Sequence, residues 1–230
     1  MLETSKKFST PVLIALIIFA DVLQALPLML LSGNFLWIEM WIYLLIFTIF
    51  TTYSLFWLRK NNPQLLESRT SMKGSPRSDK IILSLLGVVF IVYVIVVGLD
   101  GGRFHWSVVP VLVKILGFIG VAFGLIIMFL VMKENAFASK VLRVDKEGGQ
   151  KVISTGPYAI VRHPMYIGYL LMFFGLTIAL GSLFGLIPTV IVTILIIIRI
   201  PFEEKLLHEG LEGYTEYTEK VKYRLIPKIW

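Results

Sequence analysis

The sequence contains no cysteine, few charged residues and only three histidines. Without cysteine the chain cannot form disulfides, thiolate metal sites or a cysteine nucleophile. The histidines stand far apart, at His105, His163 and His208, so a histidine-rich metal site is not expected either. Charged residues make up 16% of the 230 residues and apolar residues 57%, whereas soluble domains carry about 25% charged residues. The apolar excess indicates a protein whose surface faces lipid.

Long apolar stretches follow one another along the chain, and about 20 apolar residues suffice to cross the hydrocarbon core of a membrane. Four stretches reach this length: Pro11–Leu31, Leu36–Leu58, Ile81–Leu99 and Ser107–Met132. Two more, Tyr166–Leu180 and Ser182–Ile200, would form a hairpin that turns at Gly181 and Ser182. The first of this pair is short, although Pro164 could begin its helix slightly earlier. We therefore predict an all-α integral membrane protein with about six hydrophobic helices, including a C-terminal helical hairpin.

Basic residues indicate how the chain is oriented in the membrane. The 22 lysines and arginines lie in the N-terminal tail and in segments 59–80, 133–165 and 199–230, with the exceptions of Arg103 and Lys114. Loops rich in lysine and arginine stay in the cytoplasm, so we expect these segments and both termini on the cytoplasmic side of a multi-pass protein in the cell membrane. Membrane topology thus accounts for the net charge of +7. The expected partner is the lipid bilayer, and nucleic acid is not expected.

A polar segment divides the chain. Asn61–Lys80 is the plausible linker, and it separates an N-terminal helix pair with its polar loop (residues 1–80) from a C-terminal unit (residues 81–230). Within the C-terminal unit, Gly120 and Gly124 form a pattern of small residues that lets two membrane helices approach closely. We interpret these glycines as a packing signal.

One acidic residue, Asp21, falls near the middle of the first apolar stretch. An ionised carboxylate there costs about 3 kcal/mol on insertion scales, so Asp21 must face protein, water or a partner. Lys114 is a candidate partner, although its long side chain could equally reach the outer interface. Gln24 would extend a small polar seam one turn later, and Pro27 is expected to kink the helix.

Polar side chains gather directly before the fifth apolar stretch, at Tyr158, Arg162, His163 and Tyr166. A helix that begins at Pro164 leaves its first backbone N–H groups unpaired. Together with the helix dipole and the two basic side chains, these groups favour an anion. A lipid headgroup phosphate, with the tyrosines as interfacial residues, is the alternative interpretation.

A second polar group stands where the apolar sequence ends again, and the intervening hairpin would return it to the same membrane face. It contains Arg199, Glu203 and Glu204. Arg199 and Glu203 share one helical face if the helix continues through Pro201; a solvated helix end is the alternative. The aromatic and basic tail that follows, from Tyr214 onward, is typical of an amphipathic interfacial segment, but it could also fold back over the loop.

These patterns together resemble a known family. G-P-Y-x-x-x-R-H-P-x-Y-x-G at 156–168, R-x-x-x-E-E at 199–204 and Y-x-x-Y at 214–217 are similar to isoprenylcysteine carboxyl methyltransferases. Broader relatives of that family are membrane phospholipid N-methyltransferases. The resemblance covers roughly residues 140–230. It implies S-adenosylmethionine as cofactor, a cofactor site at the cytoplasmic membrane face, and methyl transfer to an amphiphilic small molecule or lipidated acceptor.

The resemblance also implies roles for single residues. Cofactor binding falls to Lys151, Val152, Ile153, Tyr158, His163, Pro164, Met165, Tyr166 and Glu203. Arg199 would meet the acceptor, and its guanidinium could hold a carboxylate in a forked grip. A carboxylate is already ionised at about pH 7 and needs no base, whereas an amine needs one, for which Glu204 is the candidate. No metal is implied.

Three alternatives stay open beside carboxylate O-methylation, which the resemblance favours. A phospholipid amine could be the acceptor. An NADPH-dependent reductase of a sterol-like substrate is the second, because Val221–Pro227 is close to the basic tail of membrane sterol reductases; Pro164-Met165 and Glu203-Glu204 depart from the reductase pattern. A non-enzymatic carrier is the third, with Asp21 and Lys114 along its path.

Overall fold

The computed structural model describes residues 8–70, 76–138 and 149–230, and every regular element in these ranges is a helix. Five helices are long and apolar enough to cross a membrane: α2 (Thr10–Ser32), α3 (Ile38–Asn61), α5 (Arg77–Val97) with its π-helical continuation η1 (Gly98–Phe104), α6 (Val111–Glu134) and α8 (Leu186–Gly210). A sixth apolar helix, α7 (Pro164–Ala179), is shorter. The remaining elements are α4 (Pro63–Thr70), η2 (Gly156–Ala159) and α9 (Tyr214–Lys220). The predicted all-α, multi-pass membrane protein is confirmed.

Prolines decide where two of the helices begin. Helix α7 starts at Pro164, as its sequence suggested, since a proline at the first helical position loses no hydrogen bond. Helix α6 starts only at Val111 rather than at the predicted Ser107. The reason is Pro110, which disfavours helical geometry in the residue before it.

The turn between α7 and α8 is longer than predicted, and hydrogen bonds to a residue outside the hairpin stabilise it. Asp100 of η1 accepts hydrogen bonds from the hydroxyls of Ser107 and Ser182, both at 2.7 Å, and from the backbone N–H of Phe184 at 3.3 Å. Gly181 adopts a φ of +78° within this turn. Helix α8 therefore begins at Leu186 instead of Ser182. It then continues through the proline at 201 to Gly210, beyond its predicted end.

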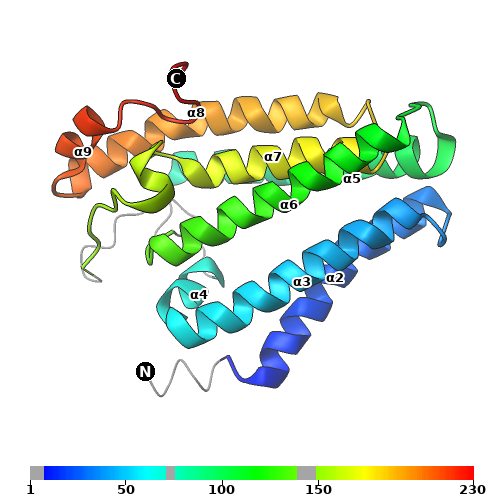
Figure 1. The fold of residues 1–230 in the computed structure, drawn as a ribbon, viewed down its shortest axis with the longest axis horizontal. Coiled ribbons are helices and arrows are strands. Elements are labelled where there is room, and N and C mark those ends of the chain that lie inside the picture. Colours follow the sequence, from blue (N-terminus) through cyan, green and yellow to red (C-terminus); the bar gives the residue numbers. More distant parts are fainter. Residues whose placement is uncertain (1–7, 71–75, 139–148) are drawn as a thin grey trace.

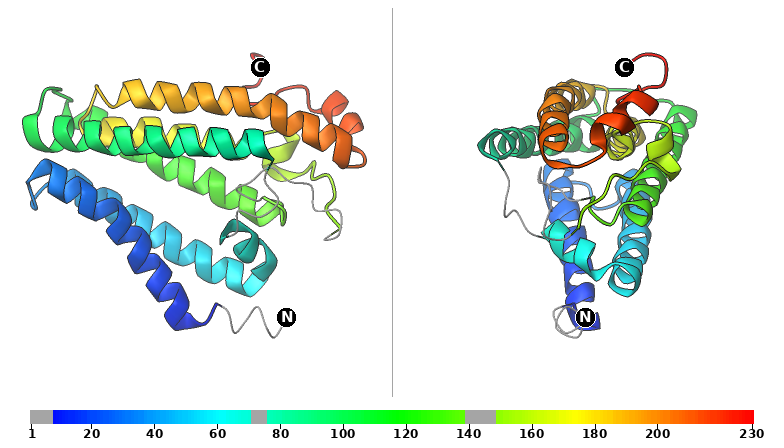
Figure 2. Two further views of the ribbon diagram at one scale, coloured as in Figure 1. Left: turned by 180° about the vertical axis from the view of Figure 1, so that it is seen from behind. Right: turned by 90° about the vertical axis from the view of Figure 1, so that its left-hand side faces the viewer.

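The helices form a bundle with an uneven outline. Helices α5, α6, α7 and α8 lie together, whereas α2 and α3 meet them near η1 and diverge from them toward the opposite end (Figures 1 and 2). That opposite end carries α4, α9, residues 150–163 and the end of the chain (Figure 1). We call it the loop end. Helix α2 also begins on this side of the molecule.

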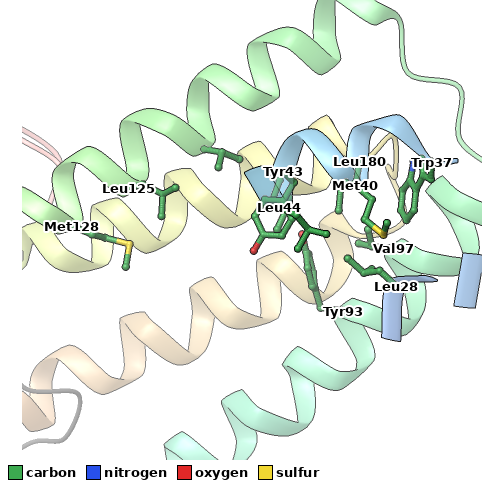
Figure 3. Close-up of a cluster of buried hydrophobic side chains, with 12 residues drawn as sticks. Leu28, Trp37, Met40, Tyr43, Leu44, Tyr93, Val97, Leu125, Met128 and Leu180 are labelled. Atoms are coloured by element: carbon green, nitrogen blue, oxygen red, sulfur yellow. The ribbon is translucent and has the colours of Figure 1, made fainter. Parts of the chain in front are cut away.

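An apolar cluster joins α2 and α3 to α5, α6 and α7. Its buried members include Leu28 of α2, Tyr43 of α3, Tyr93 of α5 and Leu125 of α6 (Figure 3). Lipid tails are as apolar as these side chains, so close van der Waals packing stabilises such clusters in a membrane more than burial itself does. The division at residue 80 stays a prediction.

Glycines of α6 and α7 let these two helices pack closely against each other. An added Cβ at Gly124 would lie 2.6 Å from the carbonyl oxygen of Gly168, and one at Gly117 would lie 2.7 Å from that of Gly175. Gly120 has more room, 3.5 Å from the nearest atom. The packing role predicted for the glycines of α6 is thus present, and Gly117 shares it.

Asp21 finds its partner on α3 rather than on α6. Thr48 donates to Asp21 at 2.9 Å, and the hydroxyl of Tyr43 donates to Gln24, so the two helices share a polar seam. Lys114 instead pairs with Glu39 at 2.7 Å. The candidate pairing of Asp21 with Lys114 is therefore not the one that the structure shows, because Lys114 meets Glu39 in the first turn of α3.

The polar linker is partly structured. Its residues 63–70 form α4, whose Leu65 and Leu66 are buried against Leu58 and Met132. Arg69 donates to the carbonyl oxygen of Ala138 at 2.8 Å. Helix α4 therefore packs on the loop end of α3 and α6, and α5 begins at Arg77, within the segment predicted to be a loop.

Candidate functional site

A cavity of about 610 Å³ lies at the loop end, between α5, α7, α8, α9 and residues 150–153. Ligand pockets in proteins typically measure about 300–1,000 Å³. Every residue predicted to bind the cofactor lines this cavity: Lys151, Val152, Ile153, Tyr158, His163, Pro164, Met165, Tyr166 and Glu203. Arg199 lines it as well. The two polar groups of the sequence, separated by the hairpin, are thus brought to one wall.

The C-terminal tail holds the first polar group in place. The backbone N–H groups of Arg162 and His163 donate to the carbonyl oxygens of Tyr223 and Arg224, both at 2.9 Å. The hydroxyl of Tyr217 donates to the carbonyl oxygen of Tyr158 at 2.8 Å. Of the two alternatives for the tail, the structure shows the one in which it folds back over the loop.

Glu204 lies behind the cavity wall. The residue is 5% exposed. Its carboxylate lies close to three basic groups: Nε of Arg162 at 2.7 Å, Nε of Arg224 at 2.8 Å and Nε2 of His163 at 3.2 Å. Burying an ionised carboxylate requires such partners. Glu204 is therefore the one predicted site residue that the structure does not place on the cavity wall, and its carboxylate ties α8 to the loop and to the tail.

The neighbouring Glu203 has a different environment. Its carboxylate accepts a 2.6 Å hydrogen bond from the hydroxyl of Tyr166, and its Oε2 lies 3.8 Å from Nδ1 of His163. The side chain of Glu203 is 26% exposed. Successive helical residues point about 100° apart, so one glutamate faces the cavity and the next faces the basic groups behind it.

Arg199 is held on two sides. Its Nε donates to Asp79 at 2.8 Å, and one of its terminal nitrogens donates to the hydroxyl of Tyr166 at 3.0 Å. Its guanidinium also lies 5.9 Å from the centre of the Tyr166 ring. The side chain is thus fixed at the junction of α5, α7 and α8.

Asp79 and Asn135 are among the polar residues of the site that the sequence analysis did not predict. Asp79, in the first turn of α5, is fully buried against Arg199. Asn135 lines the cavity, and its side chain donates to the hydroxyl of Tyr158 at 2.9 Å. An aspartate at the start of an apolar stretch was the available signal for the first residue, whereas Asn135 follows a helix end and carries no distinguishing pattern.

Tyrosines of the site keep their protons at neutral pH. Burial raises the pKa of Tyr158 to about 12, although the hydrogen bond from Asn135 opposes the shift. Burial also raises the pKa of Tyr217. Their hydroxyl groups therefore serve as neutral hydrogen-bonding groups in the cavity wall.

The other part of the cavity wall is apolar. Helix α5 contributes Leu83, Leu86, Gly87 and Phe90, and helices α7 and α8 contribute Phe173, Val192 and Ile196. An added Cβ at Gly87 would meet no atom within 4 Å. The cavity thus combines a polar wall at the loop end with an apolar wall that continues along helices exposed to the membrane.

Fold and site together define a multi-pass membrane protein with an amphiphilic cavity at one end of its helical bundle. Residues 112–212 match the family described as phospholipid methyltransferase, which includes isoprenylcysteine carboxyl methyltransferases. The resemblance found in the sequence is thereby confirmed, and the matched range contains α6, α7, α8 and the polar loop between α6 and α7. No curated protein matches the chain.

Proposed function

We propose that this protein transfers the methyl group of S-adenosylmethionine to the carboxylate of an amphiphilic, lipid-like or isoprenoid-bearing acceptor at the cytoplasmic membrane face. The observation that carries the proposal is the cavity. It joins the predicted cofactor residues, Arg199 and an apolar helical wall in one space of about 610 Å³. The match to a methyltransferase family supports the reaction class.

The polar wall suits the amino-acid end of the cofactor, which carries an ammonium and a carboxylate. Glu203, partly exposed and oriented by Tyr166, offers a charge-assisted acceptor for the ammonium. His163 and the first turn of α7 offer donors for the carboxylate. When bound, the cofactor supplies a methyl group made electrophilic by its attachment to a sulfonium.

The protein contributes mainly position and a dry environment. Methyl transfer is an in-line displacement, for which a well-oriented pair of reactants removes much of the barrier. Arg199 lies on the same wall as Glu203, so it can hold an anionic acceptor beside the cofactor. Attack by an anion on a cation neutralises charge, and exclusion of water favours such a step.

The apolar wall suits the tail of the acceptor. Leu86, Phe90 and Ile196 belong to helices α5 and α8, whose other faces are exposed where the membrane would lie. An acceptor with a polar head at Arg199 and an apolar tail along these residues would gain from both walls.

A phospholipid amine is the second candidate acceptor, and the description of the matched family favours it. An amine must lose a proton before attack. Glu204 was the base expected from the sequence, but its carboxylate is engaged by Arg162, Arg224 and His163 behind the wall. Glu203 lines the cavity, but its carboxylate is already proposed to meet the ammonium of the cofactor. Neither glutamate is therefore a good candidate base, which favours the carboxylate acceptor.

Calorimetric titration of the detergent-purified protein tests the cofactor. We expect S-adenosylhomocysteine to bind and NADPH not to bind. His163→Ala should weaken the binding, whereas His105→Ala is a matched control because His105 is exposed and follows η1, at the end of the bundle opposite the cavity. Binding of NADPH alone would instead favour the reductase, and binding of neither compound would contradict the proposed function.

Radiolabelled S-adenosylmethionine then distinguishes the acceptors. The purified protein is supplied with a farnesylated cysteine or with phosphatidylethanolamine vesicles, and the products are treated with alkali. A methyl ester releases labelled methanol, whereas a methylated amine keeps its label. Label that alkali releases from the cysteine product supports O-methylation, and label retained in the lipid would replace it with N-methylation.

A further inference from the structure

We propose that Asp79 is a positioning residue for methyl transfer, which acts by fixing the orientation of Arg199. Asp79 belongs to α5, far from the motifs that carry the family resemblance, and no part of the sequence pattern assigns it a role. The inference rests on the proposed function, because it concerns the group that would hold the acceptor.

The contact is specific in its geometry. Oδ1 of Asp79 lies 2.8 Å from Nε of Arg199, the guanidinium nitrogen that is bonded to the aliphatic part of the side chain. A terminal nitrogen of the same group donates to the hydroxyl of Tyr166 at 3.0 Å. Two contacts on different nitrogens define both the position and the rotation of a planar guanidinium, and a forked grip on an acceptor requires that rotation to be correct.

The burial of Asp79 also favours a functional role. Its exposure is 0%, and that of Arg199 is 7%. A buried ion pair contributes little to stability compared with apolar side chains of similar size, because both charges lose their hydration. The bundle already packs α5 on α8 through apolar residues such as Leu86 and Ile196. The carboxylate of Asp79 therefore contributes more to the orientation of Arg199 than to the stability of the fold.

The other fully buried aspartate provides a contrast. Asp100 is equally inaccessible, but it binds Ser107, Ser182 and backbone N–H groups in the turn at the η1 end. Those contacts hold chain segments together and lie far from the cavity wall. Asp79 also bonds across helices, from α5 to α8, but its partner Arg199 is a side chain that lines the cavity.

Turnover and cofactor affinity of Asp79 variants test the inference. Asp79→Ala removes the acceptor for Nε and should lower kcat at least about tenfold, while the Kd of S-adenosylhomocysteine stays within about twofold. Asp79→Asn keeps an oxygen that can accept from Nε and should restore at least about half of kcat. Should Asp79→Ala not fold, Asp79→Ser replaces it, because serine is too short to reach Nε.

Glu39→Gln is the matched control, since it also removes one carboxylate from an ion pair, with Lys114 at 2.7 Å. This variant should leave kcat unchanged. The assay uses the farnesylated cysteine or the phosphatidylethanolamine vesicles, whichever the wild-type protein methylates.

Three results would overturn the proposal: unchanged kcat in Asp79→Ala, equal loss of S-adenosylhomocysteine binding, or an Asp79→Asn variant as slow as the alanine. A wild-type protein that binds S-adenosylhomocysteine but methylates neither probe would overturn the proposed acceptors, and the role of Asp79 with them. A wild-type protein that does not bind S-adenosylhomocysteine would contradict the proposed function itself.

Discussion

The hydroxyl of Tyr166 donates to Glu203 at 2.6 Å and accepts from Arg199 at 3.0 Å. One side chain of α7 therefore links the carboxylate expected to meet the cofactor with the arginine expected to meet the acceptor. Both partners belong to α8, one turn apart. Substitutions in this group should separate cofactor binding from turnover.

Glu203→Gln should weaken the binding of S-adenosylhomocysteine about 10- to 100-fold, because a hydrogen bond to a charged group contributes about 1.5–3 kcal/mol. Calorimetry on the purified variant measures the change. Glu209→Gln is the control, since Glu209 is exposed on the same helix and pairs only weakly with Lys205, at 4.0 Å. Equal affinity in the two variants would remove Glu203 from the cofactor site.

Arg199→Lys should retain S-adenosylhomocysteine binding but lower kcat at least about 100-fold, since a lysine cannot reproduce the fork of a guanidinium. The measurement is single-turnover transfer of label from S-adenosylmethionine to the acceptor. Arg59→Lys is a suitable control, because Arg59 is a partly exposed arginine that donates to Thr10 of α2, outside the cavity. Near-normal turnover in Arg199→Lys would show that this arginine is only a structural charge.

Gly87→Leu should restrict the protein to acceptors with shorter apolar tails. Gly87 lines the apolar wall and has open space beside it, so a leucine would fill about four carbon groups' worth of that space. We expect kcat/KM to fall for long-tailed acceptors and to change little for short ones. Val88→Leu, at an exposed position outside the cavity, should have no such effect, and a uniform loss in Gly87→Leu would contradict the tail assignment.

Glu204→Gln should loosen the C-terminal tail. Breaking a buried ion pair typically costs about 3–5 kcal/mol, because it leaves the partner charges unpaired. We expect a lower melting temperature. We also expect faster trypsin cleavage after Lys220, Lys222 and Lys228, which lie on either side of Arg224. Glu203→Gln should leave cleavage unchanged, and an equally resistant tail in both variants would show that Glu204 does not hold it.

Much of the architecture could be predicted from the sequence because lipid imposes simple rules. A helix must satisfy its own backbone hydrogen bonds in the membrane, so each apolar stretch predicts one helix. The structure confirms the five long helices and the short one that begins at Pro164. Helix ends were less accurate: Pro110 delays the start of α6 to Val111, and the loop contacts of Asp100 delay the start of α8 to Leu186.

The sequence by itself determined the membrane class and the family resemblance, and the resemblance implied most of the residues in the cavity's polar wall. The membrane class follows from local composition and the resemblance from short motifs, and neither requires knowledge of which helices are neighbours. Only the tertiary structure decided which charges pair. It placed Glu203 on the cavity wall and Glu204 behind it. It paired Lys114 with Glu39 and Asp21 with Thr48. It also brought Asp79 of α5 to Arg199, although the two residues are 120 positions apart in the chain. Ion pairs depend on the final distances between side chains, and a polar residue in a membrane accepts whichever partner the packed helices bring within reach.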